Sequence, residues 1–129
     1  MPNYSQKHHF LFGQAICELT KNQFTFHLPQ YNSIQWLTTD HNIPTWVHIQ
    51  KRMKDIETRK CAQMLRDQRN SLLQECDYMF TSDYPLSPTQ KSAWSSYRQQ
   101  LRDLPQNCQP KLSEKMTLIN VTWPEKPSQ

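Results

Sequence analysis

Four cysteines and five histidines are the residues of this chain most suited to binding a metal or supplying a nucleophile. The cysteines stand at positions 17, 61, 76 and 108, so no C-x-x-C pair occurs. Cys61 and Cys76 fall in a predicted helix, where they would be about 22 Å apart, too far for a disulfide. His8 and His9 read as a solvated loop pair rather than a metal clip, and no H-E-x-x-H motif is present. We therefore predict no metal site and four cysteines that act as small hydrophobic residues.

Motifs for catalysis or cofactor binding are also missing from the sequence. The single glycine, Gly13, excludes the Gly-rich loops that cradle phosphates. No serine, cysteine or carboxylate lies in a recognisable catalytic motif, and no G-x-S-x-G occurs. We predict no catalytic residue, no cofactor and no small-molecule substrate, so the protein is not expected to be an enzyme.

The composition indicates one polar domain with little material for a core. The chain has 129 residues, a formal charge of +4 and 36% hydrophobic residues, with a mean hydropathy of −0.88. Either the core is small or part of the chain docks on another molecule. No apolar run reaches transmembrane length, and the first residues lack the apolar segment of a signal peptide. We expect a soluble protein of the cytosol with no membrane contact.

Residues 1–43 show the alternation that is typical of short strands. Phe10–Phe12 is a brief apolar run, and apolar residues alternate with polar ones over 15–19 and again over 24–28. Lys21-Asn22 between the last two runs predicts a hairpin turn, and 33–37 predicts a third short strand.

Two helices are predicted between residues 44 and 104. Apolar residues recur at helical spacing from Trp46 to Cys76, with Thr45 as the cap, which predicts a helix of about 30 residues. A helix of that length projects from so small a protein or pairs as a coiled coil. The second helix runs from Leu86 to Leu104, with a capping box at Ser87 and Gln90, and we expect Pro105 to end it. The short connection between the helices predicts an antiparallel helical hairpin.

The remaining residues, 105–129, predict an extended proline-rich tail. Its one strand-like run, Met116–Trp123, is suited to adding to a sheet edge of this chain or of a partner. The predicted fold class is therefore α+β. It comprises an N-terminal strand-rich segment (1–43), a helical hairpin (44–104) and a C-terminal tail (105–129).

The positive charge is concentrated on the long predicted helix. Residues 51–69 contain seven basic and three acidic residues, and the rest of the chain is balanced. One interpretation is a helix that binds nucleic acid. The other is a solvated face on which Asp55 pairs with Arg52 and Arg59 at helical spacing. No helix-turn-helix or RNP motif accompanies the stretch, so we favour the second reading, with an acidic protein as the more plausible partner.

The C-terminal half matches a pattern seen in one family of small proteins. The most specific run is Ala93-Trp94-x-x-Tyr97-Arg98-x-x-Leu101-Arg102-Asp103-Leu104. It is preceded by Arg69-x-x-Leu72-Leu73 and Asp77-Tyr78, and followed by Trp123-Pro124. Over about residues 66–127 the chain resembles the bacteriophage tail assembly chaperone-like family, whose members come from tail-fibre regions. It departs from the family pattern at Cys76, at Tyr78 and in a longer stretch over 106–115.

The resemblance implies a non-catalytic phage tail protein that binds a tail fibre or another tail protein during assembly or attachment. It implies action in the host cytoplasm, with the virion tail as a second location. The N-terminal strands, the long helix and the tail favour an alternative, a structural adaptor that stays bound in the virion. Nucleic-acid binding through 51–69 is the less favoured alternative, and self-association of the long helix would give a homo-oligomer.

Nine residues are candidates for the hairpin core or for contact with a partner. They are Leu72, Leu73, Tyr78, Trp94, Tyr97, Arg98, Leu101, Arg102 and Trp123. We expect the rings of the second helix to pack on Leu72, Leu73 and Tyr78. Two roles remain open for the charged residues: Arg98, Arg102 and Asp103 either bind a partner or cap the hairpin. In the capping role, Asp77 and Asp83 would be the counter-charges.

Overall fold

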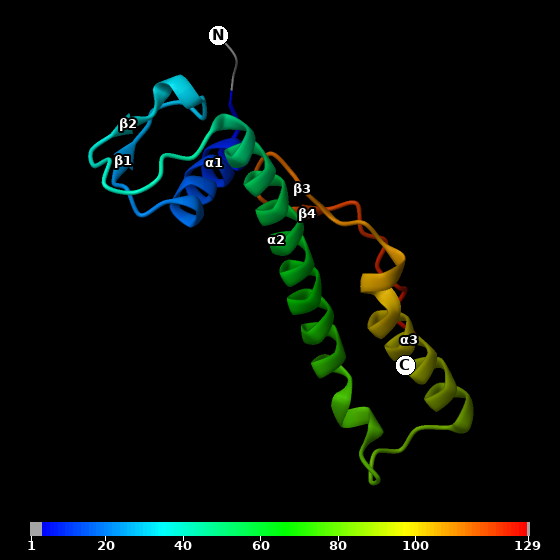
Figure 1. Ribbon diagram of the computed structural model, residues 1–129. Coiled ribbons are helices and arrows are strands. Elements are labelled where there is room, and N and C mark those ends of the chain that lie inside the picture. The colour runs from blue at the N-terminus through cyan, green and yellow to red at the C-terminus, as the bar shows by residue number, and fades with distance from the viewer. Residues whose placement is uncertain (1–3, 129) are drawn as a thin grey trace. The chain divides into compact units, whose positions relative to one another are not determined.

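The computed structural model describes residues 4–128, and this part of the chain is mixed α+β and mostly helical (Figure 1). Its helices are α1 (Gln6–Leu19), α2 (Trp46–Glu75) and α3 (Pro88–Asn107). Two short 3-10 segments are η1 (Tyr31–Ser33) and η2 (Asp77–Phe80). Its strands, each of two residues, are β1 (Phe24–Thr25), β2 (Gln35–Trp36), β3 (Lys111–Leu112) and β4 (Leu118–Ile119). The α+β class is as predicted, with more helix and less strand than expected.

The chain divides into two compact units, which we describe separately. The first unit comprises the residues up to Cys61 together with Lys111–Ile119. The second comprises Ala62–Pro110 and the residues from Asn120 onward. Residues of α2 belong to both units. The predicted division of the chain at 43 and 104 stays a prediction.

Residues 6–19 form a helix where we expected short strands, so that prediction is wrong. α1 begins at Ser5, whose hydroxyl accepts a hydrogen bond from the His8 backbone N–H. Its buried residues are Leu11, Phe12, Ala15 and Ile16. This is the spacing of one helical face, and the apparent alternation misled because Cys17 is exposed. His8 and His9 therefore lie in the first turn of a helix and not in a loop.

The N-terminal strand pair forms between different residues from those we predicted. β1 pairs antiparallel with β2, with Phe24 opposite Trp36. Asn22, expected in a hairpin turn, is 3% exposed. Its side chain donates to the His41 carbonyl (2.7 Å) and accepts from the His41 N–H (2.9 Å). The strand predicted over 33–37 is confirmed only at Gln35 and Trp36, and Ser33 ends η1.

The core of the first unit lies between α1 and the first part of α2. Its buried residues are Leu11, Phe12, Ala15, Ile16, Ile49 and Ile56. Aromatic rings of the β1–β2 segment cover it, with Phe26 edge-on to Phe12 at 4.8 Å between ring centroids. A Cβ on Gly13 would lie 3.2 Å from the Phe26 ring, so the lone glycine permits this close approach.

The two long helices match the prediction except at one end. α2 has 30 residues and begins after Thr45, whose hydroxyl accepts from the His48 N–H (3.3 Å). α3 begins with the predicted capping box of Ser87 and Gln90. Pro105 does not end α3, which continues to Asn107. That prediction is wrong because a proline in the last turn removes only one of the helix's hydrogen bonds.

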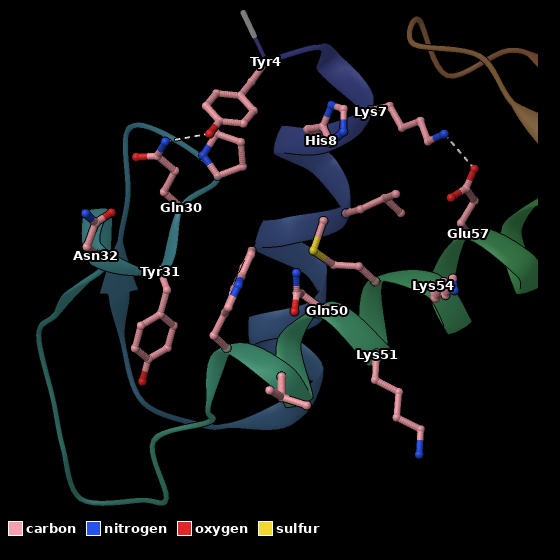
Figure 2. Close-up of a pocket in the computed structure, with 15 residues that line it drawn as sticks. Tyr4, Lys7, His8, Gln30, Tyr31, Asn32, Gln50, Lys51, Lys54 and Glu57 are labelled. Carbon is pink, nitrogen blue, oxygen red and sulfur yellow. Dashed lines mark hydrogen bonds and ion pairs between the residues drawn. The ribbon is translucent and has the colours of Figure 1, made fainter. Parts of the chain in front are cut away.

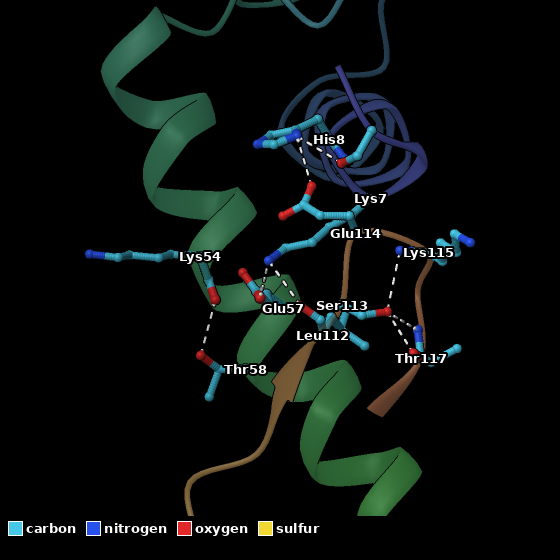
Figure 3. A network of polar contacts seen from close by, with 11 residues as sticks. Lys7, His8, Lys54, Glu57, Thr58, Leu112, Ser113, Glu114, Lys115 and Thr117 are labelled. Atoms are coloured by element: carbon cyan, nitrogen blue, oxygen red, sulfur yellow. Dashed lines mark hydrogen bonds and ion pairs between the residues drawn. The ribbon is translucent and has the colours of Figure 1, made fainter. Parts of the chain in front are cut away.

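The C-terminal segment contains a second hairpin in place of a single extended strand. β3 pairs antiparallel with β4, with Leu112 opposite Leu118. Within the first unit, Lys7 holds this hairpin (Figure 3). Its ammonium group donates to the Leu112 carbonyl (3.2 Å) and pairs with Glu57 (2.8 Å), and its backbone N–H donates to the Glu114 carbonyl. The predicted strand therefore pairs with an edge of this chain.

Candidate protein-interaction site

Six of the nine predicted site residues gather in a second hydrophobic core, which we call the ring cluster. Its buried residues are Cys76, Met79, Trp94, Tyr97 and Leu101. The half-buried residues packed against them are Leu72, Leu73, Phe80, Tyr84, Leu86 and Trp123. These residues come from the last turns of α2, from η2 and the residues on either side of it, from α3 and from the C-terminal segment, all within the second unit.

The rings of α3 face into the cluster because they share one stripe of the helix. Trp94, Tyr97 and Leu101 follow at steps of three and four residues. Trp94 is 1% exposed and meets Tyr97 edge-on at 5.7 Å between ring centroids. Burial raises the pKa of Tyr97, so this phenol stays protonated. The indole N–H of Trp94 has no hydrogen-bond partner among residues 4–128.

Arg98 links α3 to the end of α2. One terminal nitrogen of its guanidinium donates to the Leu73 carbonyl (2.9 Å) and to the Cys76 sulfur (3.0 Å). The other pairs with Asp77 at 2.8 Å. The Leu73 carbonyl is among the last in α2 and also accepts from the Cys76 backbone N–H (3.2 Å), so the guanidinium supplies a second, charged donor at this helix end. A cation at this helix end is also favoured by the helix dipole.

The surroundings of Arg98 keep it charged although its side chain is only 15% exposed. Burial opposes the charge and lowers the pKa of Arg98, but the contacts with Cys76 and Asp77 outweigh it and raise that pKa overall. The guanidinium also lies over the Phe80 ring, 5.0 Å from its centre. Of the two roles left open for Arg98, capping of the hairpin with Asp77 as counter-charge fits this geometry.

Tyr78 is the one predicted core residue that lies outside the cluster. Its side chain is 49% exposed, and its ring meets Tyr84 edge-on at 5.1 Å. A hydrogen bond between the two phenols is the main cause that raises the pKa of Tyr84. Tyr78 sits in η2, where the tight turn directs Met79 inward and leaves its neighbour facing solvent.

The other charged residues of α3 stay on the surface. Arg102 is exposed and donates to the Gln99 side chain (3.2 Å), which in turn donates to Asp103 (3.0 Å). Asp83 has no ion-pair partner among the described residues. Of the two acidic counter-charges predicted, only Asp77 pairs with an arginine.

The C-terminal segment closes over the ring cluster. Trp123 is half-buried against it. Lys126 lies 3.3 Å from Glu75 at the end of α2, and the Asn120 side chain donates to the Gln109 carbonyl (2.7 Å). The Trp-Pro segment thus forms part of the folded unit.

One family of known proteins matches this part of the chain. The family model for phage tail assembly chaperone proteins matches residues 62–128, slightly more than half of the chain. The chain belongs to the phage tail assembly chaperone family. A role in phage tail assembly follows from this membership, and the resemblance stated for 66–127 is confirmed. No curated protein and no solved structure gave a significant match.

The family segment (residues 62–128) contains all nine candidate residues. Five contributors to their packing were not among the candidates, namely Cys76, Met79, Phe80, Tyr84 and Leu86. Met79 and Phe80 are the most informative of these. Met79 is buried in the cluster, and Phe80 packs under Arg98. Both lie in the short run after α2, which we interpreted as a connection. The apolar pair beside Tyr78 was the available signal, because a solvated loop rarely places Met and Phe together.

In the part of the basic stretch that precedes the family segment, the arginines form ion pairs with a different carboxylate from the one we predicted. Arg52 and Arg59 both pair with Glu18 of α1, at 3.5 and 2.7 Å, and not with Asp55. The hydrogen bond from Arg59 is the main cause that lowers the pKa of Glu18. Lys60 lies over the Phe10 ring, 4.9 Å from its centre. Three of the seven basic side chains of the stretch, Arg52, Arg59 and Lys60, therefore have partners within the first unit.

The cysteines and histidines show no assembled reactive site in the described part of the chain. No group of three metal-binding side chains occurs among residues 4–128. All four cysteines are free; Cys61 and Cys76 are buried, whereas Cys17 is exposed. Burial raises the pKa of Cys61 and of Cys108, which disfavours their thiolates. No described helix is long and apolar enough to cross a bilayer.

Proposed function

We propose that this protein is a non-catalytic assembly chaperone that binds a tail-fibre protein, or another tail protein, in the host cytoplasm. Family membership supports the tail-assembly part of this proposal. The finer part rests on the ring cluster, whose aromatic residues are used for internal packing. A unit that is stabilised in this way presents a surface to a partner and offers no assembled catalytic group.

The binding surface that we propose is the turn after α2, centred on Tyr78. In this proposal the last turns of α2 pair with α3 as an antiparallel helical hairpin, and the ring cluster lies between the two helices. Leu72, Leu73, Trp94, Tyr97, Leu101 and Trp123 are then core residues. Tyr78 and Arg102 are exposed and available to a partner. Exposed tyrosine and arginine are enriched at protein interfaces, where their rings and forked donors supply much of the affinity.

Co-expression with the tail-fibre protein of the same phage, followed by affinity capture, tests the proposal. Tyr78→Ala should weaken capture by about tenfold or more, with an unchanged unfolding midpoint. Phe10→Ala is the matched control, because it also removes a ring from the surface, at 39% exposure, but from the first unit. Equal capture of the Tyr78 and Phe10 variants would contradict the proposed surface. Failure of the wild type to capture the tail-fibre protein, and any other tail protein of the phage co-expressed in the same way, would contradict the function.

A structural adaptor that remains in the virion is the second candidate. Apolar side chains of the first unit support it, because Leu37 is 62% and Val47 is 69% exposed. Such residues suit a permanent interface. Mass spectrometry of purified virions separates the two roles. Stoichiometric presence in the particle supports the adaptor, and absence supports the transient chaperone.

A further inference from the structure

The first unit has an open groove of about 1180 Å³ that the family segment does not account for (Figure 2). It is lined by the first turns of α1, by the residues around η1 and by the first three turns of α2. Its volume exceeds that of usual small-molecule pockets. An open site of this size suits a segment of polypeptide.

One wall of the groove combines apolar side chains with unpaired positive charge. Trp46 and Val47 begin the wall and are 36% and 69% exposed. Lys51 and Lys54 follow on the same helix, and both are exposed (Figure 2). Neither lysine has a carboxylate within 4.0 Å among residues 4–128, whereas Lys7 in the groove is neutralised by Glu57.

The start of α2 adds to this positive character. Its first turn lines the groove and contains no acidic residue. Backbone N–H groups at a helix N-terminus favour negative charge nearby. The start of α1 adds less, because the Glu114 carboxylate already lies 3.6 Å from His8 in its first turn. The lysines and the start of α2 therefore act in the same direction.

We propose that this groove binds a segment of a partner tail protein in which carboxylates alternate with apolar side chains. The carboxylates pair with Lys51 and Lys54, and an apolar side chain lies on Trp46 and Val47. The identity of the partner as a tail protein rests on the proposed function, whereas the chemistry of the segment rests on the groove alone.

Nucleic acid fits the groove less well than an acidic polypeptide. Arg52 and Arg59 already pair with Glu18, whose carboxylate would repel a phosphate. Only two lysines of the basic stretch line the groove without a partner, which gives a small electrostatic contribution to phosphate binding. Nucleic-acid binding would also leave the exposed aliphatic side chain of Val47 without a contact.

The test uses the full chain and three synthetic peptides. One alternates Asp and Glu with Leu and Phe, the second replaces the apolar residues by Ser, and the third replaces the acids by Lys. Only the first should bind, with amide shifts at Val47, Lys51 and Lys54 in NMR spectra. Lys51→Glu/Lys54→Glu should weaken it by about tenfold or more.

Lys111→Glu/Lys115→Glu is the matched control, because it makes the same charge change at two exposed lysines of the first unit outside the groove. It should change peptide affinity by no more than about twofold. Val47→Asp should also weaken the peptide, through loss of apolar contact and added repulsion. Equal loss in the control variant, or equal binding of the Ser peptide, would overturn the proposal.

Two further measurements separate this proposal from the alternatives. A labelled single-stranded oligonucleotide that bound more tightly than the first peptide, and lost binding in the Lys51/Lys54 variant, would overturn it in favour of nucleic acid. Capture of the tail-fibre protein tests the proposed function separately. Peptide binding without fibre capture would contradict that function alone, and fibre capture without peptide binding would contradict the groove alone.

Discussion

At the scale of single residues, Arg98 is the most densely connected side chain of the second unit. It donates to a carbonyl at the end of α2, contacts Cys76 and pairs with Asp77. The value of the ion pair alone is modest because Asp77 is 58% exposed. Most of the stabilisation is expected from the hydrogen bond to the half-buried end of the helix.

Arg98→Ala should therefore lower the free energy of unfolding by about 1–3 kcal/mol, because the Leu73 carbonyl loses its charged donor. Arg98→Lys should restore only part of the lost free energy of unfolding. An ammonium group lacks the planar fork with which the guanidinium reaches the Leu73 carbonyl and the Asp77 carboxylate together. Urea unfolding measures both effects. Arg102→Ala is the control, with an expected change within about 0.5 kcal/mol, and an equal loss in the control would contradict this role.

Trp94 tests whether the ring cluster is a core or a docking surface. Trp94→Ala should cost about 3–5 kcal/mol, because a fully buried ring leaves a cavity. Trp94→Phe should cost less, since it keeps most of the apolar volume and removes an unpaired buried N–H group. Thermal unfolding gives the answer, with the exposed Tyr78→Ala as the comparison. An unchanged melting temperature for Trp94→Ala would show that the ring serves a partner.

At the scale of elements, the helices with strong end signals were predictable from the sequence. Ser87, Pro88 and Gln90 specify the start of α3 by local chemistry, and the structure has that start. The apolar stripe likewise predicted the length of α2. α1 was missed because Ala15, Cys17 and Leu19 stand two residues apart and suggest a strand over a short window, although only Ala15 of the three is buried.

The candidate site was predictable in part, for a related reason. The α3 stripe is a local pattern, so the burial of Trp94, Tyr97 and Leu101 could be expected from spacing alone. The contacts of Arg98 with Leu73 and Cys76 join residues 25 and 22 positions apart. Such contacts depend on how the connection between two helices folds, which spacing within one helix does not encode. The same limit applies to the exposure of Tyr78.

Pro105 is the element-scale feature that most conflicts with its surroundings. It lies inside α3, where it has no N–H to donate to the preceding turn. Pro105→Ala should raise the free energy of unfolding by about 1–2 kcal/mol, less than the full interior penalty because α3 ends two residues later. Pro88→Ala, at the first position of the same helix, should give no gain because proline is well suited to that place. Calorimetry of both variants checks the difference, and destabilisation by Pro105→Ala would contradict it.

At the scale of the whole molecule, the family segment does not coincide with one compact unit. Residues 62–128 are matched as a continuous stretch, yet Lys111–Ile119 belong to the first unit. The hairpin in that interval brings Leu112 to 2% exposure. The first unit is therefore completed by residues of the family segment, and its stability depends on them.

Lys7 is the side chain on which this dependence is most directly measurable. It donates to the Leu112 carbonyl and pairs with Glu57, and both contacts lie within the first unit. Lys7→Met keeps the apolar stem but removes both polar contacts, so the hairpin should open more often. Amide hydrogen exchange over 111–119 should become faster by about tenfold, as expected for the loss of about 1–2 kcal/mol.

The second unit supplies the internal reference for this experiment. Amides of α3 should exchange at unchanged rates, because none of the contacts of Lys7 reaches that helix. Lys115→Met is the matched control, since it removes an exposed ammonium group from the same hairpin loop. Unchanged exchange over 111–119 in the Lys7 variant would show that strand pairing and the burial of Leu112 hold the hairpin without Lys7. Faster exchange in both units would instead show that the two units unfold as one cooperative structure.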